Sequence, residues 1–242
     1  MNRFVKISYT GKLKEGRVFD TTDEAVAKKE GMHDPKKIYS PISVIVGEGQ
    51  VIAGLDKALK NMNAGQKKTL EIPPEEGYGK RDPARVELIP MRFFKQQNMR
   101  AIPGMPVEID GRHGRIQTVA GGRVRVDFNS PLAGQTIVFD VNVESEAKTD
   151  KEKIDYLVER SFNDAKEFDV KTDAKKNASI TLPRAAFQDR NILMRKASLA
   201  AELFRFMNIE TVTFTENWEN PTKQVVEKAI EKAGMKTDNA NL

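Results

Sequence analysis

The hydrophobic pattern of this chain changes its period once, near Glu146, and this change limits the fold more than any other feature. Before that residue, apolar and polar side chains alternate over short segments bounded by glycine or proline, a pattern typical of β-strands. After it, apolar residues recur every three to four positions, which is typical of helices with one buried face. We therefore predict an α+β protein with a β-rich N-terminal part, and 242 residues are enough for two domains.

The N-terminal part is predicted to contain eight strands and three short helices. The strands are predicted at residues 3–13, 18–20, 42–47, 67–72, 107–109, 115–119, 123–128 and 136–143. The helices are predicted at residues 24–30, 52–62 and 90–97. Pro90 is expected at the first position of the last helix, because the missing N–H of proline is not needed there.

Beyond Glu146 we predict a second domain that contains both helices and strands. Thr149 and Glu152 have the spacing of a capping box, in which each side chain bonds the backbone of the other residue, and they open a helix. Asn191 is expected to cap a longer helix. The remaining elements are predicted as strands at 179–182 and 211–215 and helices at 191–207 and 220–234.

The composition excludes several classes of protein. The chain has no cysteine, which removes disulfides, thiolate nucleophiles, iron–sulfur clusters and cysteine-based zinc sites, and suits a reducing compartment. His33 and His113 are the only histidines, too few for the usual metal or Ser-His-Asp centres. No secretory pattern is visible, and no apolar stretch approaches the roughly 20 residues of a membrane helix. We predict a cytoplasmic protein with no cofactor, no bound metal and no membrane contact.

The excess positive charge is concentrated in one internal segment. The net charge is +5, and residues 81–128 carry nine Lys and Arg against five Asp and Glu. This segment is therefore expected to behave as a separate unit. Nucleic acid is not the expected partner, because no basic run is interleaved with stacking aromatics. A dinucleotide site at residues 47–54 is also disfavoured, because its glycines have the spacing G-x-G-x-x-x-x-G rather than G-x-G-x-x-G.

Three motifs, Gly-Arg-Val-Phe-Asp-Thr-Thr at 16–22, Val-Ile-Ala-Gly-Leu at 51–55 and Pro-Pro-Glu-Glu-Gly-Tyr-Gly at 73–79, stand in an order that resembles the FKBP-type peptidyl-prolyl cis-trans isomerases. Residues 127–143 look like the closing strand of these enzymes. The segment between Tyr78 and Asn129 resembles the insert-in-flap domain of the chaperone-like prokaryotic branch of the family. The chain beyond Glu146 is similar to the extra C-terminal domain of its long archaeal members.

The resemblance implies an antiparallel sheet wrapped on a short helix, with an inserted small β-rich domain and a C-terminal α+β domain. Residues 1–84 and 128–146 would form the isomerase domain, 85–127 the inserted chaperone domain and 147–242 a C-terminal domain that dimerises. The implied function is prolyl cis-trans isomerisation that accelerates protein folding, with chaperone binding of unfolded chains through the insertion. The alternative is a holdase or docking module that keeps the fold without the activity.

The resemblance also implies a substrate pocket. Asp20 is its charged member and is expected to orient Tyr9 or to polarise the amide bond that rotates. Leu55 stands where many FKBP domains place a tryptophan, which bears on the affinity for macrolide inhibitors. The implied pocket residues are Tyr9, Phe19, Asp20, Val51, Ile52, Leu55, Tyr78, Leu132 and Phe139.

Rotation of an X-Pro bond needs neither a nucleophile nor a proton transfer. The barrier is about 18–20 kcal/mol because amide resonance must be broken, and the twisted amide carries less charge on its oxygen than the planar one. A dry aromatic cup therefore favours the twisted state. We hypothesise that the Tyr78 hydroxyl and the Ile52 amide hold substrate carbonyls. Phe19 and Phe139 are expected to pack against the proline ring.

Apolar side chains crowd the inserted segment, and two interpretations stay open. Methionine and phenylalanine suit a surface that accepts many apolar sequences, but a unit of about fifty residues also needs a core. The residues assigned to the chaperone surface are Met91, Phe93, Phe94, Met99 and Met105. The expected partners are proline-containing unfolded or partly folded polypeptides. A second copy of the chain is the further expected partner, because the helix predicted at 191–207 is apolar over more than one face, although an internal core helix would give the same pattern.

Overall fold

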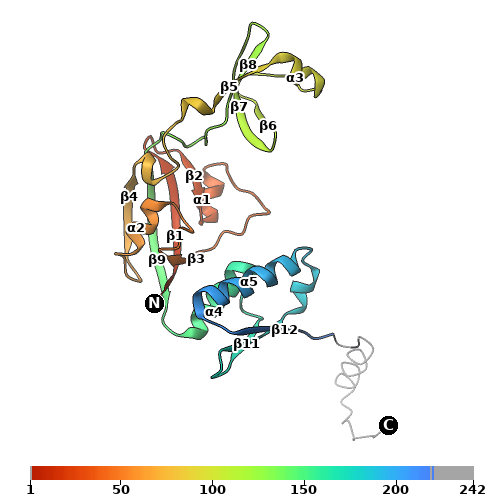
Figure 1. Ribbon diagram of the computed structural model, residues 1–242. Helices are drawn as coiled ribbons and strands as arrows, with labels where there is room; N and C mark the ends of the chain where they lie inside the picture. The colour runs from red at the N-terminus through yellow and green to blue at the C-terminus, as the bar shows by residue number, and fades with distance from the viewer. Residues whose placement is uncertain (1, 219, 221–242) are drawn as a thin grey trace, which may run out of the picture. The chain divides into compact units, whose positions relative to one another are not determined.

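The computed structural model describes residues 2–218 and residue 220, and it divides into two compact units, Met1–Glu146 and Ala147–Leu242 (Figure 1). The helix predicted at 220–234 lies outside the described residues. Within the described part of the chain, no helix is both long enough and apolar enough to cross a membrane.

The first unit is built on a five-stranded sheet. Its strands are β1 (Arg3–Leu13), β2 (Val18–Thr21), β3 (Ile42–Val46), β4 (Lys67–Ile72) and β9 (Ile137–Ala147). The strand order is β2-β1-β9-β4, and β3 pairs with the first half of β1. The pairs β1–β2, β1–β3 and β4–β9 are antiparallel, and the strands predicted at 3–13 and 67–72 are confirmed with the same bounds.

One face of this sheet is wrapped on the short helix α2 (Ala53–Leu59). Because side chains alternate along a strand, every second residue of β1 points to this face, and Val5, Ile7 and Leu13 are buried there. They share one core with Leu55 and Leu59 of α2. The helix comes very close to the sheet at Gly54, where an added Cβ would lie 2.5 Å from Cγ2 of Ile72. The other helix of this domain, α1 (Glu24–Lys29), begins at Asp23, whose side chain accepts two backbone N–H bonds.

An inserted domain follows β4 and precedes β9 (Figure 1). After two 3₁₀ turns, η1 (Pro74–Glu76) and η2 (Pro83–Arg85), it consists of β5 (Val86–Pro90), α3 (Met91–Gln96), β6 (Pro106–Ile109), β7 (Arg112–Ala120) and β8 (Arg123–Asp127). Its strands form a separate antiparallel sheet in the order β5-β8-β7-β6. Strand β5 was not predicted from the sequence. The position predicted for Pro90 is wrong, because Pro90 ends β5 and precedes the first helical residue.

The described part of the second unit, residues 147–218 and 220, contains a three-stranded sheet and two α-helices. Its elements are α4 (Asp150–Phe162), β10 (Asp169–Thr172), β11 (Asn177–Leu182), η3 (Arg184–Gln188), α5 (Ile192–Met207) and β12 (Thr211–Glu216). Strand β11 is central, antiparallel to β10 and parallel to β12. The capping box of Thr149 and Glu152 is confirmed by both of its hydrogen bonds. Asn191 occupies the N-cap position of α5, but its side chain makes no capping bond, so that part of the prediction is wrong.

Candidate active site

Four aromatic rings gather at one end of the core that the five-stranded sheet shares with α2. The ring of Phe19 on β2 meets Tyr78 and Phe139 edge-on, with centroids 6.0 and 5.8 Å apart, and Tyr9 on β1 lies 5.5 Å from Phe139. Gly11 makes room for this group, because an added Cβ would lie 2.8 Å from Cζ of Phe19 and 3.0 Å from Cζ of Phe139. Side chains from β1, β2, β9 and the segment after η1 therefore converge on one aromatic cup.

The residues of the cup differ in how much surface they offer. Tyr78 is 38% exposed, whereas Phe139 is 4% exposed and forms the floor. Val51, Ile52 and Leu132 are partly buried and pack against the same core. The predicted pocket residue Leu55 is 2% exposed and belongs to the same core cluster as Phe139. Its place in the pocket stays a prediction.

The loop that leads into α2 is held by side chains of the surrounding elements. The Gly47 amide donates to Oδ1 of Asp56, and the Ile45 amide donates to Oε1 of Gln50, both at 2.8 Å. Ile52 is the N-cap residue of α2 and stands before the first turn, where helix N–H groups have no intrahelical acceptor. These bonds tie the loop of residues 47–52 to the end of β3 and to α2.

Asp20 is held by two donors at the rim of the cup. The Tyr9 hydroxyl donates to Oδ2 at 2.6 Å, and the Lys37 ammonium donates to Oδ1 at 2.7 Å. Burial, and then the hydrogen bond to Asp20, raise the pKa of Tyr9, and burial raises the pKa of Tyr78. Both phenols are therefore neutral near pH 7.

The sequence interpretation missed the loop residues that support Asp20. Lys37 lies 5.5 Å from the centroid of the Tyr39 ring, and His33 stacks on the same ring at 5.4 Å. His33 also lies 3.2 Å from a carboxylate oxygen of Glu24. Nothing in the lysine-rich sequence around Lys37 distinguishes it, because its role depends on where the loop folds back.

The apolar residues of the insertion divide into core and partly exposed side chains. Phe94 is completely buried, in one cluster with Ile116, Val124 and Val126, so its assignment to a chaperone surface is wrong. The reason is that α3 packs on the small sheet, and Phe94 enters the core that this sheet buries. The partly buried residues around this cluster include Met91, Phe93, Met99 and Met105.

A second hollow of the first unit is an open groove of about 380 Å³ among polar residues of β1, β4 and β9, including Ser8, Thr69 and Asn142. Ser8 and Asn142 alternate with core-facing residues, so this groove lies on the opposite face of the sheet. Its side chains bond one another, as when Thr69 donates to Asp140 at 2.6 Å. Among the described residues, no three His, Asp or Glu side chains gather closely enough to hold a metal ion.

Models of known protein families match parts of both added domains. The family model described as the FKBP26 IF domain matches residues 87–132, and the model described as FKBP26 C-terminal matches residues 150–219. These ranges coincide with most of the inserted sheet and most of the second unit.

Three relatives match between 43% and 63% of this chain. A short-type peptidyl-prolyl cis-trans isomerase of Methanocaldococcus jannaschii is 37% identical over 140 residues, which are 58% of this chain and 88% of that protein. A probable FKBP-type 16 kDa peptidyl-prolyl cis-trans isomerase of Pseudomonas fluorescens is 36% identical over 109 residues, or 43% and 71% of the two chains. The FKBP-type isomerase SlyD of Haemophilus influenzae is 29% identical over 166 residues, or 63% and 75%.

The antiparallel sheet wrapped on α2, its aromatic cup and these relatives together show that the chain belongs to the FKBP-type peptidyl-prolyl cis-trans isomerases. The resemblance noted in the sequence is thereby confirmed. Within this family of enzymes, the chain is a member with an insert-in-flap domain and a C-terminal domain of the FKBP26 type.

Proposed function

We propose that isomerisation takes place in the aromatic cup, with Phe19 and Phe139 packed against the proline ring of the substrate. The observation that carries this proposal is the meeting of the Phe19, Tyr78 and Phe139 rings above the core. Such walls solvate the planar amide dipole poorly. The less polar twisted amide is therefore stabilised relative to the planar ground state. A rate gain of about 10⁶ needs only about 8 kcal/mol of this differential stabilisation.

Two hydrogen-bond donors are proposed to hold the substrate backbone. The Tyr78 hydroxyl keeps its proton, because burial raises its pKa, and it makes no hydrogen bond to any other described residue. The Ile52 amide precedes the first turn of α2 and is the second proposed donor. Both groups would bind substrate carbonyls without taking part in any proton transfer.

Asp20 is proposed to position the cup. Each of its carboxylate oxygens already accepts a hydrogen bond, one from Tyr9 and one from Lys37. This pairing leaves Asp20 suited to fixing the Tyr9 ring beside Phe139 and less suited to polarising the substrate amide. Of the two roles considered from the sequence, we therefore propose orientation.

The test is the cis-to-trans exchange rate of a short Xaa-Pro peptide, measured by NMR with catalytic amounts of protein. We expect Tyr78→Phe and Asp20→Ala each to lower kcat/KM. Glu71→Ala is the matched control, because this exposed carboxylate of β4 pairs with Lys14 in the turn after β1 and is not a residue of the cup. Rates that stay at the wild-type value in both cup variants would overturn the residue assignments.

The insertion is proposed to bind unfolded, proline-containing clients and to present them to the cup, a chaperone role. Support comes from Met91, Phe93, Met99 and Met105, which keep part of their apolar surface accessible, and from Ile102, which is 45% exposed. Flexible methionine side chains adapt to varied apolar sequences. Holding a client near the cup raises its effective concentration there.

We expect a double variant, Met99→Ser with Ile102→Ser, to slow proline-limited refolding of an unfolded protein much more than exchange in a short peptide. The short peptide reports the cup alone, so it serves as the internal control. Equal losses on both substrates would refute the client-binding role.

The second unit is proposed to form a homodimer through α5. Leu193 and Phe204 are 73% and 48% exposed, and the small residues Ala197 and Ala201 lie between them at helical spacing. Small side chains in the middle of an apolar stripe let a second helix approach closely. Light scattering is expected to give a dimer for the wild-type chain and a monomer for Leu193→Lys with Phe204→Lys. A wild-type monomer at high concentration would contradict this proposal.

The cytoplasm is the proposed location. Its support is the absence of cysteine from the sequence, which suits a reducing compartment. Cell fractionation with an antibody to the chain tests this directly.

A further inference from the structure

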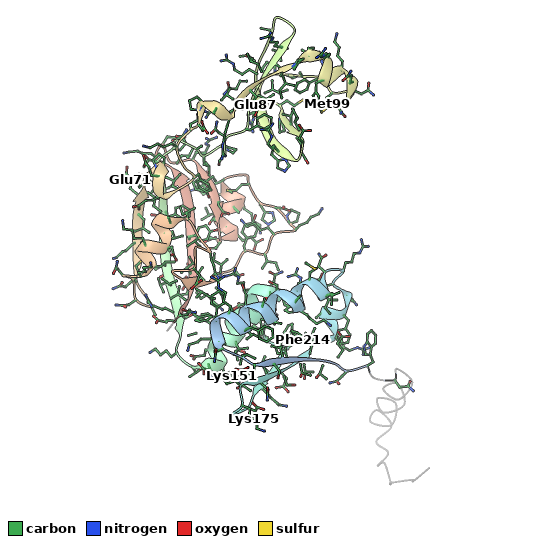
Figure 2. All side chains as sticks on the ribbon, viewed as in Figure 1. Glu71, Glu87, Met99, Lys151, Lys175 and Phe214 are labelled. Atoms are coloured by element: carbon green, nitrogen blue, oxygen red, sulfur yellow. The ribbon has the colours of Figure 1, made fainter. Side chains whose placement is uncertain are left out.

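The sheet of the insertion has one covered face and one open face. Val124 and Val126 of β8 are completely buried on the covered face, together with Phe94 of α3. Since side chains alternate along a strand, Arg123 and Arg125 point to the opposite face, and both are exposed. Figure 2 shows the insertion with Glu87 of β5 and Met99 labelled.

No carboxylate stands directly across the sheet from either arginine. In the strand register, Arg125 lies between Leu88 of β5 and Thr118 of β7, and Arg123 lies between Pro90 and Ala120. Within the described part of the chain, neither guanidinium makes an ion pair or a hydrogen bond. Both charges are therefore available to a partner.

Two arginines near these strands are paired. Arg112 binds Glu87 through two hydrogen bonds of 2.6 and 3.1 Å, and Arg81 pairs with Asp127. Asp127 is the next residue on the open face of β8, but it is buried and also accepts from Gln117 at 3.0 Å. It therefore neither reaches solvent nor neutralises the two free guanidinium groups.

Two further residues of the open face extend this charged area, and the carboxylate on the same face, Glu108 of β6, lies in register with His113 of β7. Arg115 of β7, in register with Asp127, donates to the carbonyl oxygen of Gly104 at 2.8 Å and adds a third positive charge. Leu88 is 53% exposed beside Arg125. We call Leu88, Arg115, Arg123 and Arg125 the cationic face.

We propose that the cationic face binds polypeptide segments in which Asp or Glu alternates with apolar residues. Arginine presents a planar fork that matches a carboxylate, and Leu88 offers apolar contact beside it. Binding by exposed charges is expected to weaken as salt is added. The cationic face uses none of the partly buried methionines proposed to hold clients, so the inference does not depend on that proposal.

A nucleic acid is the less suitable partner. Single-stranded nucleic acids are held by aromatic side chains that stack on bases, and the cationic face carries no aromatic residue. Three cations are also fewer than the roughly six to ten phosphate contacts of a protein with strongly salt-dependent DNA binding. The charge pattern therefore favours carboxylates carried on a polypeptide.

The test uses fluorescence anisotropy with two labelled, proline-free peptides. One repeats Asp-Leu-Ser-Leu over about 16 residues, and the other has Asn in place of Asp. For the wild-type chain we expect the Asp peptide to bind about 3- to 10-fold more tightly at low salt, and the difference to close near 300 mM salt, because exposed pairs are weak and screened. The Asn peptide separately reports client binding through apolar contact.

Arg123→Gln with Arg125→Gln is expected to abolish the preference for the Asp peptide. Arg92→Gln with Lys95→Gln is the matched control, because it removes two exposed charges from α3, on the covered side of the sheet, and should keep the preference. Arg123→Lys with Arg125→Lys keeps the charge without the fork and should give an intermediate preference.

Unchanged exchange of the short Xaa-Pro peptide and an unchanged Tm establish that these variants are folded. A preference that survives in the Gln variant, or that falls equally in the α3 control, would overturn the proposal. It would also be overturned if an oligothymidylate bound the wild-type chain more tightly than the Asp peptide and lost its binding in the Gln variant.

Discussion

The substitution Gly11→Ala should damage the aromatic cup while leaving the sheet intact. Gly11 lies on β1 opposite Asp20, and an added Cβ would stand 2.8 Å from Cζ of Phe19 and 3.0 Å from Cζ of Phe139. The backbone of Gly11 is not in the left-handed region, so alanine adopts it without strain. The effect of this substitution therefore comes from the contact with the two rings.

The size of the effect follows from which ring can move. Phe139 is buried in the core, so Phe19 must turn away, and its edge contacts with Tyr78 and Phe139 are lost. Each such contact is worth about 0.5–1.5 kcal/mol beyond burial. If both losses appear in the transition state, about 1–3 kcal/mol corresponds to about a 5- to 150-fold lower kcat/KM.

The assay is again NMR exchange of a short Xaa-Pro peptide, with urea unfolding measured in parallel. Gly114→Ala is the matched control, because its Cβ would meet Phe128 and Val126 at the same distance of 2.8 Å, but inside the insertion. We expect the control to destabilise the insertion and to leave short-peptide exchange unchanged. The reasoning is refuted if folded Gly11→Ala retains kcat/KM within about twofold of the wild type, since Phe19 would then contribute less than about 0.5 kcal/mol.

Three further outcomes are expected. Gly54→Ala should lower the free energy of unfolding by about 1–3 kcal/mol in urea titrations, because its Cβ would overlap Cγ2 of Ile72; an unchanged midpoint would contradict this close approach. Lys37→Met should lower kcat/KM by up to about fivefold, and Lys37→Arg should restore it, because the partly exposed pair with Asp20 is worth at most about 1 kcal/mol; equal activity of the Met and Arg variants would argue against the pair. The raised pKa of Tyr9 means that its contribution to stability is complete below about pH 10, where unfolded tyrosine ionises, and falls as the pH rises further. Between pH 9 and 11 the free energy of unfolding of the wild type should therefore fall more than that of Tyr9→Phe. Equal falls in the two proteins would show that folding does not raise the pKa of Tyr9.

Much of the secondary structure could be predicted because its causes are local. The alternation of β1 places its core residues on one face whatever the strand pairs with, and the bounds of this strand were predicted correctly. The capping box at Thr149 needs only residues three apart, and it forms as the sequence predicts. Strand β5 was missed because its five residues, Val86–Pro90, do not alternate cleanly, and pairing with β8 makes them extended.

The candidate site was predictable only in part. Phe19, Tyr78 and Phe139 stand far apart in the sequence, and only their motifs indicated a common pocket, which the folded sheet then brings within 6.0 Å. Lys37 escaped notice because one lysine among several in a polar loop has no distinguishing pattern. Its bond to Asp20 exists because the loop returns to the rim of the cup.

The sequence by itself determined the alternation of the strands, the capped start of α4 and the family to which the enzyme belongs, because each depends on residues close together or on recognisable motifs. The tertiary structure alone decided that Phe94 and Leu55 are buried in their cores and that Arg123 and Arg125 have no partner among the described residues. Burial and charge pairing depend on which segments meet across the fold. The sequence alone does not show whether a single apolar or charged residue packs against a partner or faces water.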